Sequence, residues 1–569
     1  MKTHEYWVSS RRAVVFSSIL LLLLLVPAIT GLAQDYTYTT NGGTITITKY
    51  TGPGGVVIIP DRINGLSVSR IGDNAFYVLK SVDIPTNLVT SVRIPDSVTS
   101  IGNNVFEYCT ALTNVMIGTN VISIGSWVFA YCTNLPGITI PDSTTNIGPW
   151  TFENCSSLTA IMVGANNPAY CSVDGVLFDK NLITLIQCPM RKTGTSFTIP
   201  DSVITINVSA FEYCTGLTNV VIGANVANIG NNAFYGCSGL TRVMMPDSVA
   251  SIGPGAFQSC TNLASVTIPN GVTSIAGSVF FGCARLTNVT IPSTVTYIGD
   301  WAFYQCSSLT GVTIPDSVII VGGSAFNQCS SLSRVTIGNG VTSIGANAFY
   351  SCSGLTSINI PDGVTSLGYN AFAACSSLTN ATIGNGLTSI ASGTFLWCSK
   401  LSSVTIGASV TDIGESAFVE CSILANVTIP ASVTHIEGWV FEYCTNLNGV
   451  YFQGNAPNAD STMFYGDNHT TVYYLLGTTG WGSTFGGRPA VPWNPQFQVN
   501  DTSFGVRTNR FGFNVTGTAG IPIVVEACTN LTSQMWQPWQ SCTLTNGSVY
   551  FSDPTWTNYP TRLYRIRWP

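Results

Sequence analysis

The residues that could do chemistry in this chain of 569 are few, and most of them are cysteines. Only three histidines occur, His4, His435 and His469; His4 lies in the predicted leader, and neither of the others is flanked by a second metal ligand or a nucleophile motif. Residue spacing therefore supports neither serine–histidine catalysis nor a zinc site. We expect no catalytic residue, no cofactor and no bound metal, and we expect His435 to be a solvated surface residue.

The 18 cysteines mostly follow one spacing, in which a cysteine comes three residues after a phenylalanine. These pairs recur every 23 residues from Phe211/Cys214 to Phe441/Cys444. Equivalent residues on stacked turns lie ~4.8 Å apart, whereas the Cβ atoms of a disulfide lie about 3.8 Å apart. We therefore expect a ladder of buried thiols, with disulfides between turns as the alternative. Cys528 and Cys542 lie outside the repeat, and a disulfide between them stays an open alternative.

Carboxylates recur after the proline of the repeat. They are Asp96, Asp142, Asp201, Asp247, Asp316 and Asp362. Regular neighbours in this set are at least two turns apart, or roughly 10 Å, which is too far for both to ligate one calcium ion at about 2.3–2.6 Å. A proline–aspartate pair at the centre of a turn explains them instead.

The elements that position these residues follow from one repeat unit, Leu286 to Ser308. Val289 and Ile291 flank Thr290, which is the period-two pattern of a short half-buried strand, and Pro292 ends it. Gly299 breaks the next segment, and Ala302 to Cys306 fits a single helical or 3-10 turn. Because one such layer buries its apolar face only against its neighbours, the period predicts a solenoid of stacked parallel strands, centred near Val220, Val243, Val266, Val289, Val312 and Val335.

The pattern L-T-x-V-x-I-P-x-x-V-x-x-I-G-x-x-A-F-x-x-C closely resembles the BspA-like (Treponema-type) leucine-rich repeat over roughly residues 60–493. Phenylalanines at the marker position, from Phe76 to Phe441, give fifteen units. The resemblance implies a right-handed repeat solenoid with a parallel β-sheet on its concave face. It also implies an exported adhesin or receptor that binds protein or glycan, on a cell surface or in the matrix.

The N-terminus predicts export. Lys2, Arg11 and Arg12 precede an apolar run, and Gly31 and Ala33 supply the small residues of a cleavage site. We expect residues 1–33 to be a cleaved signal peptide, with an uncleaved membrane anchor as the alternative. No second apolar run approaches the ~18 residues of a membrane helix, so we expect a secreted or cell-surface protein without a transmembrane segment after cleavage.

Three further segments are expected after residue 33. Residues 34–60 alternate around Asn41–Gly43 and predict a β-hairpin cap. Residues 61–493 form the solenoid, with inserts near 80–95 and 164–198. The second insert is predicted as two strands joined through Asp179–Asn181.

After the proline-broken linker Val491–Gln496, residues 497–569 predict a small all-β, sandwich-like module. Its expected strands are Phe511–Val515, Ile521–Ala527, Val549–Phe551 and Leu563–Ile566. Its tryptophans, Trp536, Trp539, Trp556 and Trp568, would either form its core or offer a sugar-stacking surface.

The remaining candidate for function is the outward side of the strands. The residue between the two buried positions of each strand gives the candidate binding set: Met116, Thr139, Val221, Met244, Thr267, Thr290, Thr313, Thr336, Asn359, Thr382, Thr405, Thr428 and Tyr451. Strand propensity alone also explains exposed threonine, so recognition is one of two interpretations. The apolar end of the set is the better docking surface.

Charge limits the partners. Charged residues make up 8% of the chain and the net charge is −6, so we expect no nucleic-acid partner. Three hypotheses stay open: a binding or adhesion protein, a structural surface protein or stalk without a specific ligand, and an enzyme accessory with its site in the C-terminal module.

Overall fold

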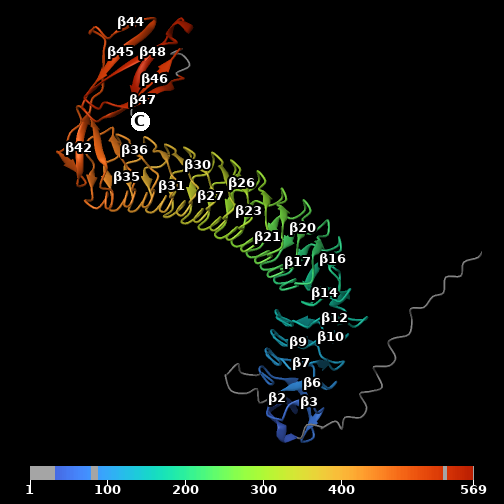
Figure 1. The fold of residues 1–569 in the computed structure, drawn as a ribbon. Helices are drawn as coiled ribbons and strands as arrows, with labels where there is room; N and C mark the ends of the chain where they lie inside the picture. The colour runs from blue at the N-terminus through green and yellow to red at the C-terminus, as the bar shows by residue number, and fades with distance from the viewer. Residues whose placement is uncertain (1–32, 78–87, 530–534, 568–569) are drawn as a thin grey trace, which may run out of the picture. The chain divides into compact units, whose positions relative to one another are not determined.

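The computed structural model describes residues 33–77, 88–529 and 535–567, and its regular structure is almost entirely β (Figure 1). Two short 3-10 helices, η1 (Ala33–Asp35) and η2 (Trp556–Asn558), are the helical elements of this part. Contacts divide the chain into two compact units, Met1–Lys180 with Pro189–Arg191 and Asn181–Cys188 with Lys192–Pro569. Residues 1–32 of the predicted leader and residues 80–87 of the first predicted insert lie outside the described residues. The other half of that predicted insert, up to residue 95, is not inserted, because it holds β6 (Val89–Arg93) of the repeating turns.

Each turn of both units contributes one longer strand, and in most of these strands a buried central residue lies between more exposed neighbours, whereas β38 (Gly449–Phe452) is buried throughout. In the first unit these strands are β3 (Gly55–Ile58), β6 (Val89–Arg93), β8 (Asn114–Met116), β10 (Gly137–Ile140) and β12 (Ala160–Val163). In the second unit they are β16 (Ser196–Thr198), β18 (Asn219–Val221), β20 (Arg242–Met244), β22 (Ser265–Thr267), β24 (Asn288–Thr290), β26 (Gly311–Ile314), β28 (Arg334–Ile337), β30 (Ser357–Ile360), β32 (Asn380–Ile383), β34 (Ser403–Thr405), β36 (Asn426–Ile429), β38 (Gly449–Phe452), β40 (Thr471–Leu475) and β42 (Arg488–Trp493). Val220 pairs in parallel with Val243, and Val266 with Val289, which confirms the predicted strands and their 23-residue register.

A second column of mostly two-residue strands forms another side of each unit. In the first unit it comprises β5 (Leu66–Ile71), β7 (Ser100–Ile101), β9 (Ser123–Ile124) and β11 (Asn146–Ile147). β1 (Tyr36–Asn41) and β2 (Thr44–Tyr50) form an antiparallel hairpin, and β2 then pairs in parallel with β5, while β4 (Arg62–Ile63) pairs antiparallel with β5. In the second unit it comprises β15 (Thr184–Gln187), β17 (Thr205–Ile206), β19 (Asn228–Ile229), β21 (Ser251–Ile252), β23 (Ser274–Ile275), β25 (Tyr297–Ile298), β27 (Ile320–Val321), β29 (Ser343–Ile344), β31 (Ser366–Leu367), β33 (Ser389–Ile390), β35 (Asp412–Ile413), β37 (His435–Ile436) and β39 (Asn458–Ala459).

The third side of each turn is not the helical turn that the sequence predicts. In the 23-residue repeat that begins at Leu286, Trp301 and Gln305 both have a left-handed backbone, with φ of 55° and 58°. Two such residues four positions apart prevent a right-handed helix from forming. The backbone bonds instead to the next turn, where the Phe303 N–H donates to the Ala325 carbonyl at 2.7 Å. Successive turns are therefore hydrogen-bonded on all three sides.

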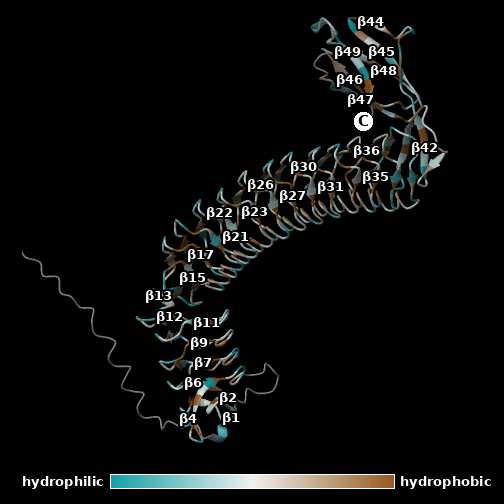
Figure 2. Ribbon diagram, turned by 180° about the vertical axis from the view of Figure 1, so that it is seen from behind, coloured by the Kyte–Doolittle hydropathy of each residue, from teal (hydrophilic) through white to brown (hydrophobic). Residues whose placement is uncertain are grey.

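In the interior enclosed by the three sides of each turn, one phenylalanine stacks on the phenylalanine of the next turn. Phe326 is fully buried, and its ring centroid lies 5.1 Å from that of Phe303 and 5.2 Å from that of Phe349, with planes 5° and 4° apart. Figure 2 shows the same regularity in the hydropathy of the ribbon, where hydrophobic positions recur turn after turn. The core is a set of columns that run from turn to turn.

The repeat cysteines form one of these columns, and their thiols are hydrogen-bonded. The Cys306 Sγ donates to the Phe280 carbonyl at 3.2 Å, and the Cys329 Sγ donates to the Phe303 carbonyl at the same distance. Burial raises the pKa of Cys306 well above its usual value and that of Cys329 to about 12. The predicted thiol ladder is confirmed for thirteen repeat cysteines, each of which donates to a phenylalanine carbonyl of the preceding turn: Cys109, Cys132, Cys155, Cys237, Cys260, Cys283, Cys306, Cys329, Cys352, Cys375, Cys398, Cys421 and Cys444.

These thiols should be inert in the folded protein. Buried thiols with raised pKa values hold little thiolate, which is the reactive form. We expect a thiol reagent to modify few repeat cysteines in the native protein and most of them after denaturation without a reductant. Mass spectrometry of the labelled protein counts the modified thiols. A denatured chain with almost no reactive thiol would show that the ladder is disulfide-linked.

The recurrent aspartates tie one turn to the next. The Asp96 carboxylate accepts hydrogen bonds from the Thr119 backbone N–H at 2.7 Å and from the Thr119 hydroxyl at 3.0 Å, and these bonds lower the pKa of Asp96. Asp201 accepts from the Ala224 N–H, and Asp316 accepts from the Asn339 N–H, each at 2.7 Å. The aspartates therefore satisfy backbone donors across the turn boundary, a role beyond the turn preference that the sequence suggests.

The second insert contains a hairpin that the sequence did not predict. β13 (Tyr170–Val173) pairs antiparallel with β14 (Val176–Asp179) through a turn at Asp174–Gly175. The predicted connection through Asp179–Asn181 is also present, between β14 and β15 (Thr184–Gln187). Asp174 and Gly175 both have positive φ, at 52° and 77°, as a two-residue turn between strands requires. The Asp-Gly pair is the stronger hairpin signal, and its flanking strands are four residues each.

The C-terminal module consists of two small antiparallel sheets. One contains β43 (Gln496–Gln498), β44 (Gly505–Arg507), β45 (Arg510–Thr516) and β48 (Ser548–Asp553), and the other contains β46 (Pro522–Cys528), β47 (Gln537–Thr543) and β49 (Leu563–Arg567). All four strands expected from the sequence are present. Trp536, Trp539 and Trp556 are half-buried, while the buried core is made of residues such as Phe513, Ile523 and Phe551.

The register of this module excludes the disulfide that the sequence left open. Cys542 on β47 lies opposite Ile523 on β46, five residues before Cys528 along the same strand. Five residues of strand span about 16 Å, far more than a disulfide can bridge.

The module shares its core with the last turns of the second unit. Tyr451, Tyr473 and Trp493 from β38, β40 and β42 belong to one buried cluster with Phe513 and Ile521 of the module. The Trp493 indole N–H donates to the Pro522 carbonyl at 3.0 Å. Residues 491–496, predicted as a linker, therefore contribute a buried strand end to this packing.

Candidate binding surface

The outward side of the longer strands, here called the long-strand face, carries the predicted binding residues. Of the thirteen, ten are exposed and two, Thr382 and Thr428, are half-buried. The exposed ones are Met116, Thr139, Val221, Met244, Thr267, Thr290, Thr313, Thr336, Asn359 and Thr405. Their strands hold them outward because the residue on either side, such as Val289 and Ile291 around Thr290, points into the core.

The parallel register places these residues in a row. Val221 lies directly opposite Met244, Thr267 opposite Thr290, and Thr313 opposite Thr336. Further along, Asn359 lies opposite Thr382, which in turn lies opposite Thr405. Neighbouring strands of a sheet are ~4.8 Å apart, so the second unit presents an evenly spaced row of side chains.

Tyr451, the last residue of the predicted set, is not available at this surface. It lies opposite Thr428 in the row but is fully buried, because the C-terminal module covers it. Its ring stacks on that of Tyr473, with centroids 4.9 Å apart, and burial raises its pKa. The prediction that Tyr451 faces solvent is wrong, and the open row ends near Thr428.

Three members of the row were missing from the predicted set. Arg93 lies opposite Met116, Met162 lies opposite Thr139, and Thr198 lies opposite Val221. All three follow the buried central residue of their strand, so the repeat pattern itself could have identified them. They were overlooked because each strand adjoins one of the two interruptions of the 23-residue period.

The row carries exposed methionines on β8 and β12 of the first unit and near the start of the second unit. Met116 and Met162 in the first unit are 55% and 51% exposed, and Met244 in the second is 57% exposed. These are among the most exposed large hydrophobic side chains in the described part of the chain. Because they sit on strands with hydrogen-bonded neighbours, they form small rigid apolar patches.

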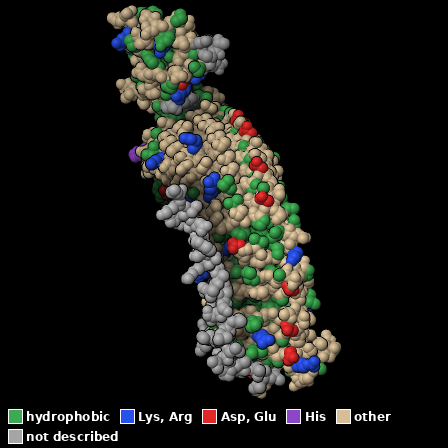
Figure 3. Space-filling model, turned by 90° about the vertical axis from the view of Figure 1, so that its right-hand side faces the viewer, with side chains coloured by type: hydrophobic (Ala, Val, Ile, Leu, Met, Phe, Trp, Pro, Cys, Tyr) green, Lys and Arg blue, Asp and Glu red, His purple; other side chains and the backbone are tan. Residues whose placement is uncertain are grey.

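Charge on the long-strand face is slight and positive. A second outward row precedes the buried valine of each strand, and it holds mainly serine, asparagine and glycine, with Arg242 and Arg334 exposed. No carboxylate occupies either row of the described longer strands from β8 to β36. Figure 3 shows how sparse charged side chains are on the visible surface.

A ladder of hydroxyls borders the face. The Thr287 hydroxyl donates to the Ala264 carbonyl at 3.1 Å, and the Thr379 hydroxyl donates to the Thr356 carbonyl at 2.9 Å, in each case one turn earlier. These bonds hold the side chains in one orientation, so a partner meets an ordered surface without a further loss of side-chain entropy.

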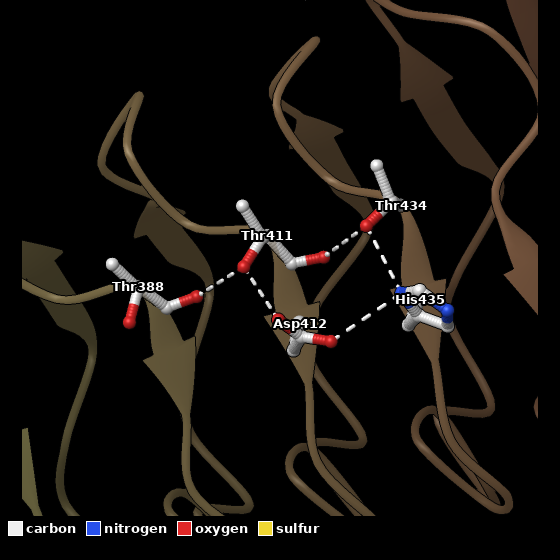
Figure 4. Close-up of polar contacts among 5 residues, drawn as sticks. All are labelled: Thr388, Thr411, Asp412, Thr434 and His435. Atoms are coloured by element: carbon white, nitrogen blue, oxygen red, sulfur yellow. Dashed lines mark hydrogen bonds and ion pairs between the residues drawn. The ribbon is translucent and has the colours of Figure 1, made fainter.

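A histidine–aspartate pair of the described repeats lies on the short strands β35 and β37 (Figure 4). His435 Nδ1 lies 3.4 Å from Asp412 Oδ1 and 3.0 Å from the Thr434 hydroxyl. A catalytic relay needs the carboxylate and the nucleophile on opposite ring nitrogens, whereas both partners here contact Nδ1. Both side chains are at least half exposed, so the group is a surface polar contact.

Among the residues described by the structure, no three His, Cys, Asp or Glu side chains gather closely enough to hold a metal ion. In the same part of the chain, no helix has the length and apolar character needed to cross a bilayer.

Solved structures of bacterial repeat proteins resemble this chain. A leucine-rich repeat protein from Bacteroides ovatus is 25% identical over 77% of this chain and 93% of its own, with a TM-score of 0.40. One from Eubacterium ventriosum is 26% identical over 59% of this chain and 91% of its own, with a TM-score of 0.44. A leucine-rich cell surface protein from Faecalibacterium prausnitzii is 26% identical over 53% and 93%, with a TM-score of 0.31. No curated protein matches the chain.

The family comparison covers most of the chain. The sequence model of the BspA type Leucine rich repeat region (6 copies) matches residues 69–174, 187–310, 296–422 and 368–483, which span the observed turns of both units. The chain belongs to the BspA-type leucine-rich repeat family.

Proposed function

We propose that this protein is an exported, non-enzymatic binding or adhesion protein that uses the long-strand face of its solenoid to hold a protein or a glycan. The observation that carries the proposal is the row from Val221 to Thr405, which is regular, outward and nearly uncharged. Catalysis needs a convergent set of acid, base or nucleophile, and the row contains none.

Rigidity supports binding by this face. The strands are fixed by hydrogen bonds to both neighbouring turns, and the exposed methionines supply apolar contact at defined positions. A partner would therefore bury apolar area without first ordering the surface. Export follows from the leader composition at residues 1–33, and an N-terminal sequence that begins at Gln34 in the exported protein would support it.

Lysines placed in the row test the proposal. Thr267, Thr290, Thr313 and Thr336 are exposed, so their joint replacement by lysine should leave the core layers intact, although like charges on neighbouring strands should lower the unfolding free energy by up to about 2–3 kcal/mol. The same change puts four like charges across the proposed contact surface. We expect attachment of the full mature protein to cells or matrix to fall at least about tenfold, measured by surface plasmon resonance or cell binding.

A charge-matched control separates the effect of charge on the long-strand face from the effect of net charge. Ser251, Ser274, Ser366 and Ser389 are exposed on the short strands, and their replacement by lysine adds the same charge on another side of the turns. This control variant should attach like wild type. Equal attachment by both variants would overturn the proposal for this stretch and favour the structural or stalk role.

A further inference from the structure

The C-terminal module carries a polar cleft that the solenoid proposal does not use. It lies on the outward side of the sheet that contains β44, β45 and β48, and its volume is about 640 Å³. Arg507, Arg510, Asn514, Tyr550 and Ser552 line it. The opposite side of β45, with Phe513 and Val515, is the buried core of the module, so the lining residues are held on a fixed strand.

Two arginines face each other across the tip of this sheet. Arg507 and Arg510 are directly opposed partners in the β44–β45 hairpin, whose turn residues Thr508 and Asn509 have positive φ of 44° and 63°. Like charges in this position are destabilising. Among the described residues, no carboxylate lies within ion-pair distance of either guanidinium. Asp501, near the cleft, accepts hydrogen bonds from the Ser503 N–H at 2.8 Å and from the Asn514 amide at 3.4 Å.

A tyrosine ring forms the floor beside these charges. A side chain at Gly512 would collide with the Tyr550 hydroxyl and Cζ, so the Tyr550 ring lies across the backbone of β45 at that glycine. The ring is nevertheless 46% exposed. It therefore offers an aromatic surface to solvent while its other side rests on the strand.

We propose that this cleft binds an acidic saccharide. Guanidinium groups bind carboxylates and sulfates with paired hydrogen bonds, which would offset the repulsion between Arg507 and Arg510. The electron-rich tyrosine face attracts the C–H groups of a pyranose ring. The Asn514 amide and the Ser552 hydroxyl supply hydrogen bonds for sugar hydroxyls, and the cleft has the volume of a small-ligand site.

A long polyanion such as nucleic acid fits the site less well. The chain as a whole has a net charge of −6, which repels an extended polyphosphate. Two arginines also neutralise too few phosphates for strong binding of this kind. The inference is independent of the long-strand face, since the lysine variants of the solenoid leave these residues untouched.

The test uses the full mature chain, because the module shares its core with the last turns. Isothermal titration with trigalacturonate, with a sulfated trisaccharide and with uncharged maltotriose distinguishes carboxylate, sulfate and neutral ligands. We expect binding of at least one acidic trisaccharide and at least about tenfold weaker binding of maltotriose. The double change Arg507→Gln and Arg510→Gln should weaken acidic binding at least about tenfold, and Tyr550→Ala should weaken it severalfold.

Two further variants keep the test decisive. Arg507→Lys with Arg510→Lys retains the charge and the hairpin, and we expect intermediate affinity because the paired hydrogen bonds are lost. Arg285→Gln with Lys400→Gln removes two exposed positive charges from the solenoid outside both rows of the long-strand face, and this control should bind like wild type. Equal binding of maltotriose, equal losses in the control, or binding of DNA or anionic vesicles through these arginines in place of the trisaccharides would overturn the proposal.

Discussion

Replacing Phe326 by alanine should destabilise the middle of the second unit by about 3–5 kcal/mol. Phe326 is fully buried, and it is stacked on Phe303 and Phe349, so its removal opens a cavity between two turns. In a repeat array each layer is stabilised by its two neighbours. The loss should therefore uncouple the turns on either side, which a mutation at a chain end would not do.

Hydrogen exchange and limited proteolysis measure this effect locally. We expect faster exchange and new cleavage between residues 303 and 349, together with a lower urea midpoint. Phe281 provides the matched control, because it is half-buried on the surface and stacks on Tyr304 with centroids 4.7 Å apart. Phe281→Ala should cost about 1 kcal/mol. Equal effects of the two substitutions would show that the inner phenylalanine column does not couple the turns.

The architecture was predictable because the same physical demand recurs in every turn. Val289, Ile291 and Cys306 each occupy a buried column position that stacking on the next turn requires, so their spacing sets the parallel register. A single segment of three residues would not identify a strand, but the same pattern repeated in many turns does. The same argument predicted that Thr267 and Thr290 point outward.

The third side of the turn was mispredicted because left-handed residues carry no uniform signal. Asparagine, as at Asn347, is common in that conformation, but Ser324 and Trp301 occupy the equivalent position in the two preceding turns, and their residue types are not. Hydrogen bonds from the backbone to the next turn over-determine the conformation there. Propensity at one residue cannot reveal a bond to a residue in the next turn.

Tyr451 shows the limit of repeat logic at the end of an array. Its position in the pattern predicts exposure, and the longer strands before it obey that rule. The C-terminal module has no repeat spacing that would reveal where it packs, so sequence alone could not show that it covers β38 and β40. The arginines of the cleft escaped notice for a related reason, since only the hairpin register brings Arg507 opposite Arg510.

The cysteine column also ends with a substitution. Asp467 follows Cys444 by 23 residues and occupies the position at which the next repeat cysteine would stand. The Asp467 N–H donates to the Phe464 carbonyl at 3.1 Å, and the Cys444 N–H makes the equivalent bond to the Phe441 carbonyl one turn earlier. It is 2% exposed, and within the described residues neither carboxylate oxygen has a hydrogen-bond partner. Burial raises the pKa of Asp467 to about 7, although the charge of Arg488 lowers it.

A carboxyl group whose pKa is raised by folding makes stability fall as pH rises. Between pH ~4 and 7 the folded state keeps the proton that the unfolded state has lost. The free energy of unfolding therefore falls as the pH rises through this window, and the full loss is reached above it. The full shift corresponds to about 4 kcal/mol, and partial solvation of the carboxyl group reduces this to about 2–3 kcal/mol.

Asp467→Cys should therefore stabilise the C-terminal turns at pH 8 by about 2–3 kcal/mol and have little effect at pH 4, because a buried thiol carries no charge to desolvate. The new thiol would also occupy, one turn later, the position equivalent to Cys444, whose Sγ donates to the Phe418 carbonyl. Hydrogen exchange of peptides covering residues 441–475, followed from pH 4 to 8 and corrected for intrinsic exchange, reports the local free energy.

Asp460→Asn is the control. The Asp460 carboxylate is exposed and accepts from the Thr462 hydroxyl and N–H, which lower its pKa, so its loss should weaken the same turns slightly at pH 8. Protection at pH 8 that is no higher in Asp467→Cys than in wild type would show that Asp467 is ionised and well solvated in the folded protein.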